Sequence, residues 1–294
     1  MKIGFIGAGN VGTAFGKFLV NNGQNVIGFY SRTYSSSVNA AKYTNTNAFS
    51  KLNELIAKVD LIFITTPDDT IKKTVDYITE KRWLNKEQII CHMSGALSSS
   101  TLISAQYIGC CIYSIHPLQS FADIEISVKN IGNTFFSLEG SKEKLELIKD
   151  FLSNLKLNYF VIDPNHKTIY HVAACVFSNY LVTLLDYGLI LLNEIGIDKD
   201  KGIKAMLPLI KGTINNTVSF DTKDALTGPI ARGEIITLKN HLNELINKFP
   251  EYFDFYHNLL IQTLPLAQKE KLPPHKAEAL KELLGGINFE KSDC

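Results

Sequence analysis

Short apolar runs alternate with amphipathic segments along the first half of the chain. The runs have the length and composition of buried strands in a parallel sheet, and the segments between them have helical spacing. Strands are expected over residues 2–6, 25–30, 60–64, 88–92, 110–115, 133–138 and 158–162. Because strands that alternate with helices form βαβ units, the pattern predicts an α/β fold with a doubly wound, mostly parallel sheet.

The alternation stops near Asp163 and Pro164, and only helical patterns and loops follow. Helices are expected over residues 165–195, 199–218, 235–249, 251–269 and 274–284, with residues 219–233 as the main non-helical interruption. The sequence therefore predicts two domains. An α/β domain is expected over residues 1–163, and an all-α domain over residues 164–294.

The first apolar run leads directly into a G-x-G-x-x-G motif, Gly7-Ala8-Gly9-Asn10-Val11-Gly12. Between a strand and a helix, the first glycine permits a tight turn, the second lets the backbone approach a pyrophosphate, and the third lets helix and strand pack closely. The amides and the positive dipole end of the helix favour phosphates. The motif predicts a Rossmann dinucleotide-binding domain, with Gly7, Ala8, Gly9, Asn10 and Val11 at the cofactor.

The end of the second predicted strand indicates which dinucleotide binds. A carboxylate that reads the ribose of NAD normally lies about 20 residues after the motif. Here Ser31 and Arg32 occupy that strand end, and the first acidic residue of the chain is Glu54. Because a hydroxyl and a guanidinium are suited to a 2′-phosphate, NADP is the expected cofactor.

Three further strand ends carry polar or small residues where ligands bind in doubly wound sheets. We expect Thr65-Thr66-Pro67 beneath the nicotinamide-side ribose, and Ser94-Gly95 to offer a hydroxyl and amides to the substrate. His116 is expected to donate a hydrogen bond or to act as an acid. Each also has a local interpretation, namely a helix cap at Thr66, a turn at Ser94-Gly95 and a satisfied loop histidine.

A polar stripe follows the start of the long apolar helix predicted after residue 164. Lys167, His171 and Ser178 are spaced by four and seven residues and share one face, and Asn179 lies beside them. Burying such groups without partners costs about 1–3 kcal/mol each. The stripe therefore favours a cleft facing the nicotinamide, although a solvated first turn also explains Lys167.

Arg232 is a further candidate, for binding the carboxylate of a substrate. It follows the turn signal Thr227-Gly228-Pro229, and its planar guanidinium matches a carboxylate bidentately. The equal alternative is a surface ion pair with Glu234 or Asp224.

Composition narrows the functional classes. A chain of 294 residues that is 45% hydrophobic and 20% charged suits two globular domains, and a net charge of +1 gives no support for a nucleic-acid or anionic-membrane partner. The five cysteines have no metal-ligand spacing, so no metal is expected and a reducing cytosol is favoured. Residues 180–192 are the most apolar later segment and are too short to span a bilayer. We expect a cytoplasmic protein.

With these residues in view, the chain resembles a group of proteins that join an N-terminal Rossmann-like NADP-binding domain to a helical C-terminal domain of unknown function. The resemblance covers residue 1 to about residue 250. It depends on the glycine motif and on residues 92–95, 114–121, 170–174, 178–179 and 226–233. Their layout is similar to the superfamily of 6-phosphogluconate, β-hydroxyacid and ketopantoate dehydrogenases and pyrroline-5-carboxylate reductase.

This resemblance implies NADPH-dependent reduction of the carbonyl of a small 2-oxo acid, with ketopantoate (2-dehydropantoate) of pantothenate biosynthesis as the best single candidate. The ketopantoate reductase pattern, a helix lysine followed by paired asparagines, is matched only loosely by Lys167 and Asn179. The reaction needs a proton donor near the carbonyl. The expected catalytic residues are Lys167, His171, His116, Asn179 and Ser94, and the expected substrate-binding residues are Ser94, Gly95, Ser178 and Arg232.

Two other functions fit the same sequence. A cyclic-imine reductase of the pyrroline-5-carboxylate type would need less from a general acid, because its substrate arrives protonated. A non-catalytic protein that senses NADP(H) would use its helical half to engage a partner. A homodimer formed through the helical domain is expected, since the apolar helix over residues 173–192 suits a dimer core.

Overall fold

The computed structural model describes residues 1–268 and 272–285. By its internal contacts the chain divides into two compact units, Met1–Leu185 and Asp186–Cys294, and each is described by itself.

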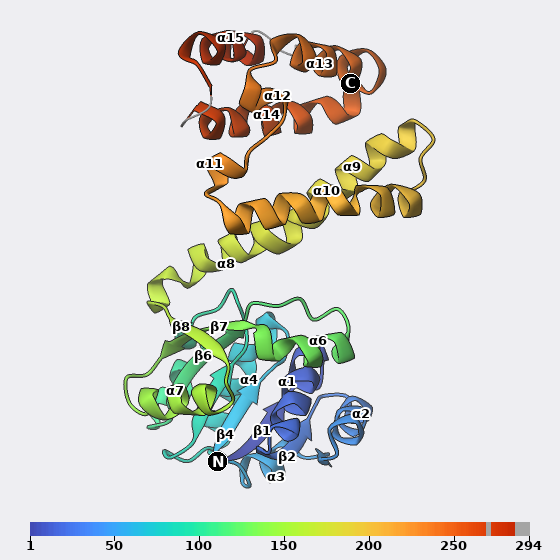
Figure 1. The fold of residues 1–294 in the computed structure, drawn as a ribbon. Helices are drawn as coiled ribbons and strands as arrows, with labels where there is room; N and C mark the ends of the chain where they lie inside the picture. The colour runs from blue at the N-terminus through green and yellow to red at the C-terminus, as the bar shows by residue number, and fades with distance from the viewer. Residues whose placement is uncertain (269–271, 286–294) are drawn as a thin grey trace, which may run out of the picture. The chain divides into compact units, whose positions relative to one another are not determined.

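The first unit contains one eight-stranded sheet with the order β3-β2-β1-β4-β5-β6-β7-β8 (Figure 1). All neighbouring strands run parallel except β6 and β7, which are antiparallel. The strands are β1 (Lys2–Ile6), β2 (Asn25–Tyr30), β3 (Asn47–Phe49), β4 (Leu61–Ile64), β5 (Ile89–His92), β6 (Cys111–Pro117), β7 (Phe135–Gly140) and β8 (Asn158–Val161). The seven predicted strands are confirmed, whereas β3 is one that the sequence pattern did not predict.

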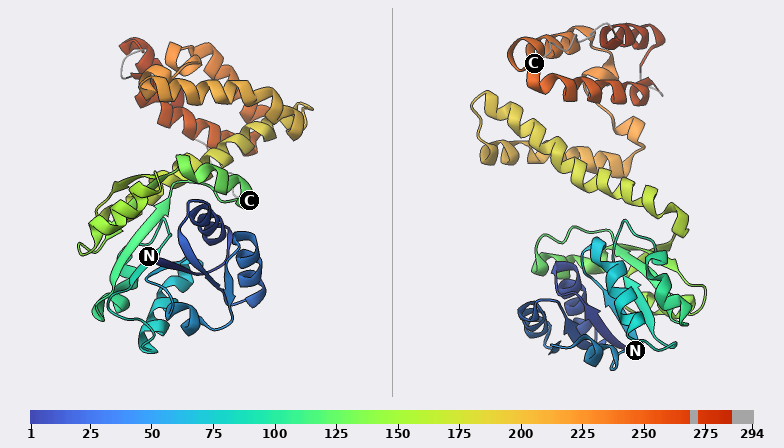
Figure 2. Two further views of the ribbon diagram at one scale, coloured as in Figure 1. Left: turned by 60° about the horizontal axis from the view of Figure 1, so that its bottom comes forward. Right: turned by 180° about the vertical axis from the view of Figure 1, so that it is seen from behind.

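Helices cover both faces of this sheet, as Figures 1 and 2 show. They are α1 (Asn10–Asn21), α2 (Tyr34–Thr44), α3 (Leu52–Ile56), α4 (Asp68–Glu80), α5 (Ile103–Tyr107), α6 (Ile124–Asn130) and α7 (Leu145–Asn154). Successive residues of the central strands enter opposite cores. Leu61 and Phe63 pack in one core, and Ile62 and Ile64 pack in the other. This alternation explains why the buried strands read as continuous apolar runs.

A continuous helical stretch, Pro164–Glu194, follows β8. It consists of a 3₁₀ turn (Pro164–His166), α8 (Lys167–Cys175), a π-helical turn (Val176–Tyr180) and α9 (Leu181–Glu194). The sheet ends at Val161, near the predicted boundary at residue 163, but the first compact unit continues through α8 and the π-helical turn. The start of α8 belongs with the sheet because Lys167 is buried against β6 and β7.

The same stretch is long and apolar enough to cross a membrane by length and composition, with a mean hydropathy of 1.6 over its most apolar window. Residues 180–192 are too short for this on their own, but the span in the structure also includes the earlier part of the helix predicted over residues 165–195. One such helix is weak evidence for a membrane span, and it is the single candidate among the described residues.

The second unit is helical. Its helices are α10 (Lys199–Ser219), α11 (Thr222–Ala225), α12 (Pro229–Arg232), α13 (Ile235–Lys248), α14 (Phe253–Gln268) and α15 (Pro274–Gly285). Helices α12 to α15 enclose a core that includes Leu238, Leu242, Leu260 and Leu280. The prediction that residues 219–233 are non-helical was wrong in part. Asp221 caps α11 through Lys223 N and Pro229 starts α12, so turn residues here initiate short helices. Residue 269, at the predicted end of the fourth C-terminal helix, lies outside the described residues.

Candidate active site

The glycine turn after β1 is tight on one side and open on the other. Gly7 has a φ of 112°, and a Cβ there would lie 2.6 Å from the carbonyl carbon of Thr65. A Cβ on Gly12 would lie 2.4 Å from Thr65 Oγ1, whereas nothing lies within 4 Å of the Cβ position of Gly9. Two glycines are thus required by packing, and the third leaves the backbone open to a ligand.

The N-terminus of α1 is suited to a phosphate. Gly9 precedes the helix, no side chain caps it, and its first turn holds no acidic residue. Gly9 and Asn10 are exposed. Asn10 Nδ2 donates to the carbonyl of Phe121 at 2.8 Å, which ties the turn to the loop after β6. Free amides and the helix dipole can therefore act on an anion at this point.

Of the residues predicted beside this turn, two have a structural role and one has a side chain that could bind a ligand. Thr65 Oγ1 donates to the carbonyl of Gly7 at 3.0 Å, and Pro67 precedes α4 as its N-cap. Thr66 Oγ1 is buried, with no hydrogen-bond partner among the described residues. A buried hydroxyl without a partner costs free energy, so its placement fits contact with a bound ligand.

Ser31 and Arg32 follow β2, and the carbonyl of Tyr30 in that strand accepts a bond from Gly7 N at 2.8 Å. The guanidinium of Arg32 is exposed and makes no ion pair or hydrogen bond with any described residue. Because no carboxylate holds it, the guanidinium is available for a phosphate. The open Gly9, the Thr66 hydroxyl and Arg32 together fit the predicted NADP.

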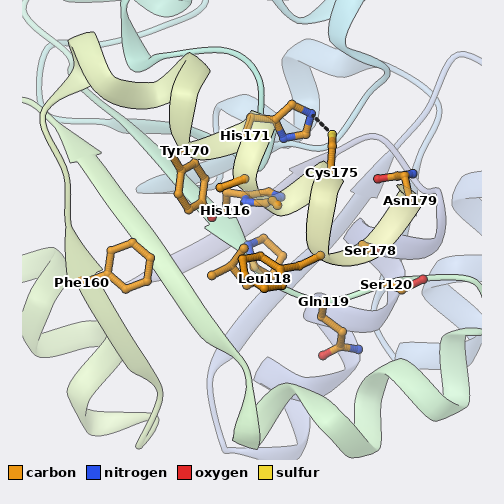
Figure 3. A pocket seen from close by; sticks show the side chains of 14 residues that line it. His116, Leu118, Gln119, Ser120, Phe160, Tyr170, His171, Cys175, Ser178 and Asn179 are labelled. Carbon is orange, nitrogen blue, oxygen red and sulfur yellow. Dashed lines mark hydrogen bonds between the residues drawn. The ribbon is translucent and has the colours of Figure 1, made fainter. Parts of the chain in front are cut away.

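A cavity of about 600 Å³ lies within the first unit, between the loop after β6, strand β8 and the start of the long helix (Figure 3). Its polar wall is made by His116, Gln119, Ser120, Tyr170, His171, Cys175, Ser178 and Asn179. The remaining lining is Pro117, Leu118, Phe160, Ala173, Ala174 and Phe177. The described lining holds no Asp, Glu, Lys or Arg side chain, so the cavity suits a small ligand of mostly apolar character.

Two imidazoles converge on one point of the wall. A Cβ on Gly95 would lie 2.6 Å from His171 Nδ1 and 2.7 Å from His116 Nε2. His171 Nδ1 is buried without a hydrogen-bond partner among the described residues, and His171 Nε2 lies 3.5 Å from Cys175 Sγ. The missing side chain of Gly95 therefore leaves the space that both rings face.

His116 is paired with a tyrosine. Its Nδ1 lies 2.7 Å from the hydroxyl of Tyr170, and Figure 3 shows the two side chains adjacent in the wall. Burial lowers the pKa of His116 to about 3, and the nearby positive charge of Lys167 adds to this effect. The imidazole is neutral at physiological pH, so one of its nitrogens donates while the other accepts.

Lys167 lies behind this wall and does not line the cavity. It is 1% exposed, and its Nζ donates to Ser114 Oγ at 2.8 Å and to Ser137 Oγ at 3.2 Å. Burial lowers the pKa of Lys167 to about 8, and the buried carboxylate of Glu139 opposes this shift. The solvated first turn considered for Lys167 is thus not what the structure has, and neither is direct exposure to the cavity.

Two other predicted residues line the cavity, and a third has a structural role in a turn. Ser178 and Asn179 line the cavity from the π-helical turn. Ser94 forms the turn that carries Gly95, since its hydroxyl donates to Asp68 Oδ2 at 2.8 Å and accepts from the amides of Ala96 and Leu97. This bonding matches the local turn interpretation.

Arg232 belongs to the second unit. Its side chain is 60% exposed, and its Nε donates to Glu234 Oε1 at 2.5 Å, which is the surface ion pair considered from the sequence. Substrate binding by Arg232 stays a prediction.

Tyr170 is the site residue that sequence reasoning missed, although it lies between Lys167 and His171 in the chain. The available signal was its spacing, since a residue three positions after Lys167 lies on the same helix face. Cys175 also lines the cavity and was not predicted there. Among the described residues, no group of His, Cys, Asp and Glu side chains is arranged to hold a metal ion.

Two family models match the chain. Residues 1–117 match the Rossmann-like domain, and residues 134–263 match a domain of unknown function, DUF2520. A search of the curated proteins gave no match.

Solved structures share the fold. A candidate NADP oxidoreductase from Bacteroides fragilis is 24% identical, with a TM-score of 0.72 over 89% of this chain and 96% of that one. An imine reductase from a Pseudomonas species is 17% identical, with a TM-score of 0.65 over 96% and 99% of the two chains. A pyrroline carboxylate reductase from Plasmodium falciparum, solved with NADP bound, is 17% identical, with a TM-score of 0.62 over 97% and 98%. The predicted Rossmann sheet with a helical C-terminal region is therefore confirmed.

Proposed function

Because the chain joins a Rossmann-like domain to a DUF2520 domain, we propose that it is an NADP-dependent oxidoreductase that reduces a C=O or C=N bond of a small molecule. The observation that carries this proposal is the hydrogen-bonded His116–Tyr170 pair in the wall of the cavity. The Asn10–Phe121 hydrogen bond connects the loop that begins at this pair to the glycine turn. The pair, proposed as the proton donor, and the turn, proposed to bind an anion, thus both lie beside the sheet of the first unit.

The cofactor is assigned to this chain from its own residues. Gly9 leaves the approach open, the first amides of α1 bind the pyrophosphate, and Arg32 binds the 2′-phosphate. NADPH supplies the hydride when it is bound. The structural neighbours support the choice, since the Plasmodium enzyme was solved with NADP.

The residues of the cavity supply the remaining chemistry. His116 donates a proton from Nε2 to the substrate, because its Nδ1 is occupied by the Tyr170 hydroxyl. Asn179 and Ser178 orient the reacting bond with their polar groups. Leu118, Phe160 and Phe177 supply apolar lining against which the rest of the substrate packs.

A carbonyl is the favoured substrate, because a proton-donating pair is needed when a developing alkoxide must be neutralised. Ketopantoate is the 2-oxo acid that we propose to test first, with Arg232 as the proposed ligand of its carboxylate. A cyclic imine is the second candidate. The shared fold with an imine reductase favours it, and so does a cavity lining whose described residues include no Lys or Arg to bind a carboxylate.

We include a homodimer in this proposal. The helical stretch of the first unit exposes large apolar side chains, among them Ile169 at 65%, Phe177 at 81% and Val182 at 65%. Helix α10 of the second unit exposes Leu209 at 68% and Val218 at 82%. Large apolar side chains exposed to this extent are typical of a protein interface, and a second copy of the chain is the occupant expected from the sequence.

Oxidation of NADPH by the purified protein tests the reaction. Ketopantoate, a cyclic imine and an uncharged ketone are offered in turn, and loss of NADPH absorbance is followed. Turnover of the carbonyl compounds is expected. Turnover of the imine alone would select the second candidate, and tight NADPH binding without any turnover would identify a cofactor-sensing protein.

The cofactor assignment has a separate test. Arg32→Ala is expected to weaken NADPH binding by about 10- to 100-fold, the equivalent of one charged hydrogen bond, and to leave NADH binding nearly unchanged. Arg82→Ala, an exposed arginine in the turn after α4, is the matched control. Equal losses for both cofactors in Arg32→Ala would contradict a 2′-phosphate contact.

A further inference from the structure

The loop between β6 and α6, residues 118–123, contacts both parts of the candidate site. Three of its residues line the cavity, namely Leu118, Gln119 and Ser120 (Figure 3). At the next position, the carbonyl of Phe121 accepts a hydrogen bond from Asn10 Nδ2 of the glycine turn at 2.8 Å. The loop is therefore the segment through which the glycine turn sets the position of a cavity wall.

Both ends of this loop are held by contacts that do not involve the glycine turn. At its start, Leu118 N donates to the carbonyl of Phe135 at 2.8 Å. Gln119 Nε2 donates to the carbonyl of Ser127 at 3.1 Å. At its end, the side chain of Asp123 caps α6. The ends are thus fixed by β7 and α6, and the three residues between them depend on other contacts.

Asn10 holds the middle of the loop. Its Nδ2 donates to the carbonyl of Phe121 at 2.8 Å and to the carbonyl of the following residue at 3.4 Å. In the part of the chain that the structure describes, these are the only hydrogen bonds of residues 120–122. The Phe121 side chain also packs against one of the two cores of the sheet, as Ala8 and Val11 of the turn do. One carboxamide thus supplies all the directional contacts of this segment.

The main chain of the same asparagine lies where a phosphate is expected. Asn10 is the first residue of α1 and is exposed. The amides of a first helical turn have no partner within the helix, so the Asn10 amide is available to an anion. Asn10 therefore offers its amide to the proposed cofactor and its side chain to the loop that lines the cavity.

We propose that Asn10 is a positioning residue of the reductase. Its carboxamide holds the cavity wall of residues 118–120 in register with the pyrophosphate-binding turn, so that the substrate lies at the correct distance from the hydride donor. This inference rests on the proposed function and deepens it. Asn10 acts on the substrate through the loop and does not touch it.

The chemistry of a carboxamide suits this position. It donates to a carbonyl without placing a charge beside the phosphates, whereas a carboxylate in its place would repel both the phosphates and the carbonyl oxygens. Transfer between two bound molecules is sensitive to small displacements, and an error of about 1 Å lowers the rate by about 100-fold. Because Asn10 is exposed, loss of its side chain is expected to loosen the loop without unfolding the chain.

Asn10→Ala removes the hydrogen bond to the loop, and Asn22→Ala is the matched control. Asn22 is an exposed asparagine at the other end of α1, and its Nδ2 donates to the carbonyl of Phe18 in its own helix at 2.8 Å. With the compound that the wild type reduces, kcat/KM is expected to fall by about 10- to 100-fold in Asn10→Ala. In Asn22→Ala it is expected to stay within about twofold of the wild type.

The affinity for NADPH separates this role from direct cofactor binding. Both variants keep every main-chain amide of α1, so the Kd for NADPH in a fluorescence titration is expected to stay within about twofold of the wild type. A loss of NADPH affinity in Asn10→Ala as large as its loss of kcat/KM would assign the side chain to the cofactor and overturn the positioning role.

Limited proteolysis without cofactor or turnover reports the loop itself. Chymotrypsin cleaves after Phe121 only when the loop opens, and mass spectrometry measures the rate at that bond. Cleavage is expected to be about three- to tenfold faster in Asn10→Ala, the equivalent of one hydrogen bond, and unchanged in Asn22→Ala at a similar Tm. An unchanged rate in Asn10→Ala would overturn the proposal.

The outcomes distinguish this inference from the proposed function. A wild type that oxidises no NADPH with any of the compounds offered contradicts the proposed function, and the positioning role is overturned with it. An active wild type whose Asn10→Ala and Asn22→Ala variants have the same kinetics removes the positioning role alone.

Discussion

At the scale of single residues, the lack of a side chain at Gly95 leaves room for the two imidazole rings. Its Cα faces His171 Nδ1 and His116 Nε2 so closely that a methyl group would approach both nitrogens to less than 3 Å. Both rings are held from behind, His116 by Tyr170 and His171 by Cys175. Space at residue 95 is therefore a condition for the placement of His116, the proposed proton donor.

Gly95→Ala is expected to lower kcat/KM by about 100-fold, since a displacement of about 1 Å in a catalytic group has an effect of that size. NADPH binding is expected to stay within about twofold, as the glycine turn is untouched. Gly132→Ala is the control, because nothing lies within 4 Å of the Cβ position there. Steady-state kinetics and a cofactor titration measure both quantities. Wild-type kinetics in Gly95→Ala would show that the histidines have room to move.

The pKa of Lys167 predicts how the rate depends on pH. Folding lowers this pKa from 10.5 to about 8, so the ammonium form is lost as the pH rises through about 8. The positive charge of Lys167 makes His116 a stronger acid, and kcat is therefore expected to fall along the alkaline limb with a midpoint near 8. Lys167→Met is expected to have a low kcat without this limb. An unchanged limb in Lys167→Met would assign the titration to another group.

At the scale of elements, the sequence pattern predicts the buried strands but not the shortest strand and helices. Buried strands such as β4 are long enough to give a continuous apolar run, so sequence predicts them. Strand β3 has three residues, too few for a period, and α11 and α12 have four residues each, fewer than a helical pattern needs. Local capping by Asp221 and Pro229 decides these short helices, and periodicity does not record it.

The same contrast explains which site residues the sequence predicted. His116 and Gly95 follow from the rule that ligands bind at the carboxyl ends of parallel strands. Whether Lys167 faces the cavity or the sheet depends on how the first turn of α8 docks on β6 and β7. That docking is a tertiary property, and spacing along one helix does not contain it. Tyr170 was missed for the same reason.

The π-helical turn (Val176–Tyr180) is an element with a functional interpretation. A π turn inserts an extra residue into a helix and re-aims the side chains around it, and such turns are frequent at functional sites. Here it carries Ser178 and Asn179, both in the cavity lining. An uninterrupted α-helix would rotate the residues on either side of this turn relative to each other.

Asn179→Ala is expected to lower kcat/KM by about three- to tenfold, the equivalent of one hydrogen bond to the reacting group. Folding is expected to be unaffected, because Asn179 is exposed to the cavity. Asn193→Ala, near the end of α9, is the control of the same chemistry. If the two variants had the same kinetics, Asn179 would have no part in orienting the substrate.

The distribution of apolar surface is the main property at the scale of the whole molecule. The helical stretch after the sheet is apolar on faces that its own unit leaves exposed. A second copy of the chain or a bilayer would remove this surface from water, and the proposed dimer is the simpler cover for a chain for which we propose a soluble cofactor.

Light scattering of the purified protein in buffer without detergent is expected to give a mass of about twice the chain mass of 32.8 kDa. Replacing Val176 and Val182 with Glu is expected to give monomers, because two charges then lie within the apolar face. Replacing Tyr107 and Ile126 with Glu, equally exposed but on α5 and α6, is expected to leave the dimer intact. A monomeric wild type, or a requirement for detergent, would contradict the dimer.

The cavity contains one cysteine that a reagent can label. Cys91, Cys110 and Cys111 are buried free thiols whose pKa is raised by burial, whereas Cys175 is partly exposed and lines the cavity. Thiolates react and buried thiols do not, so an alkylating reagent is expected to modify Cys175 first in a Cys294→Ser background. Any compound that occupies the cavity would slow that labelling. Ligands can thus be ranked by protection of a single thiol before the reaction is known, and the true substrate is expected to be among the strongest protectors.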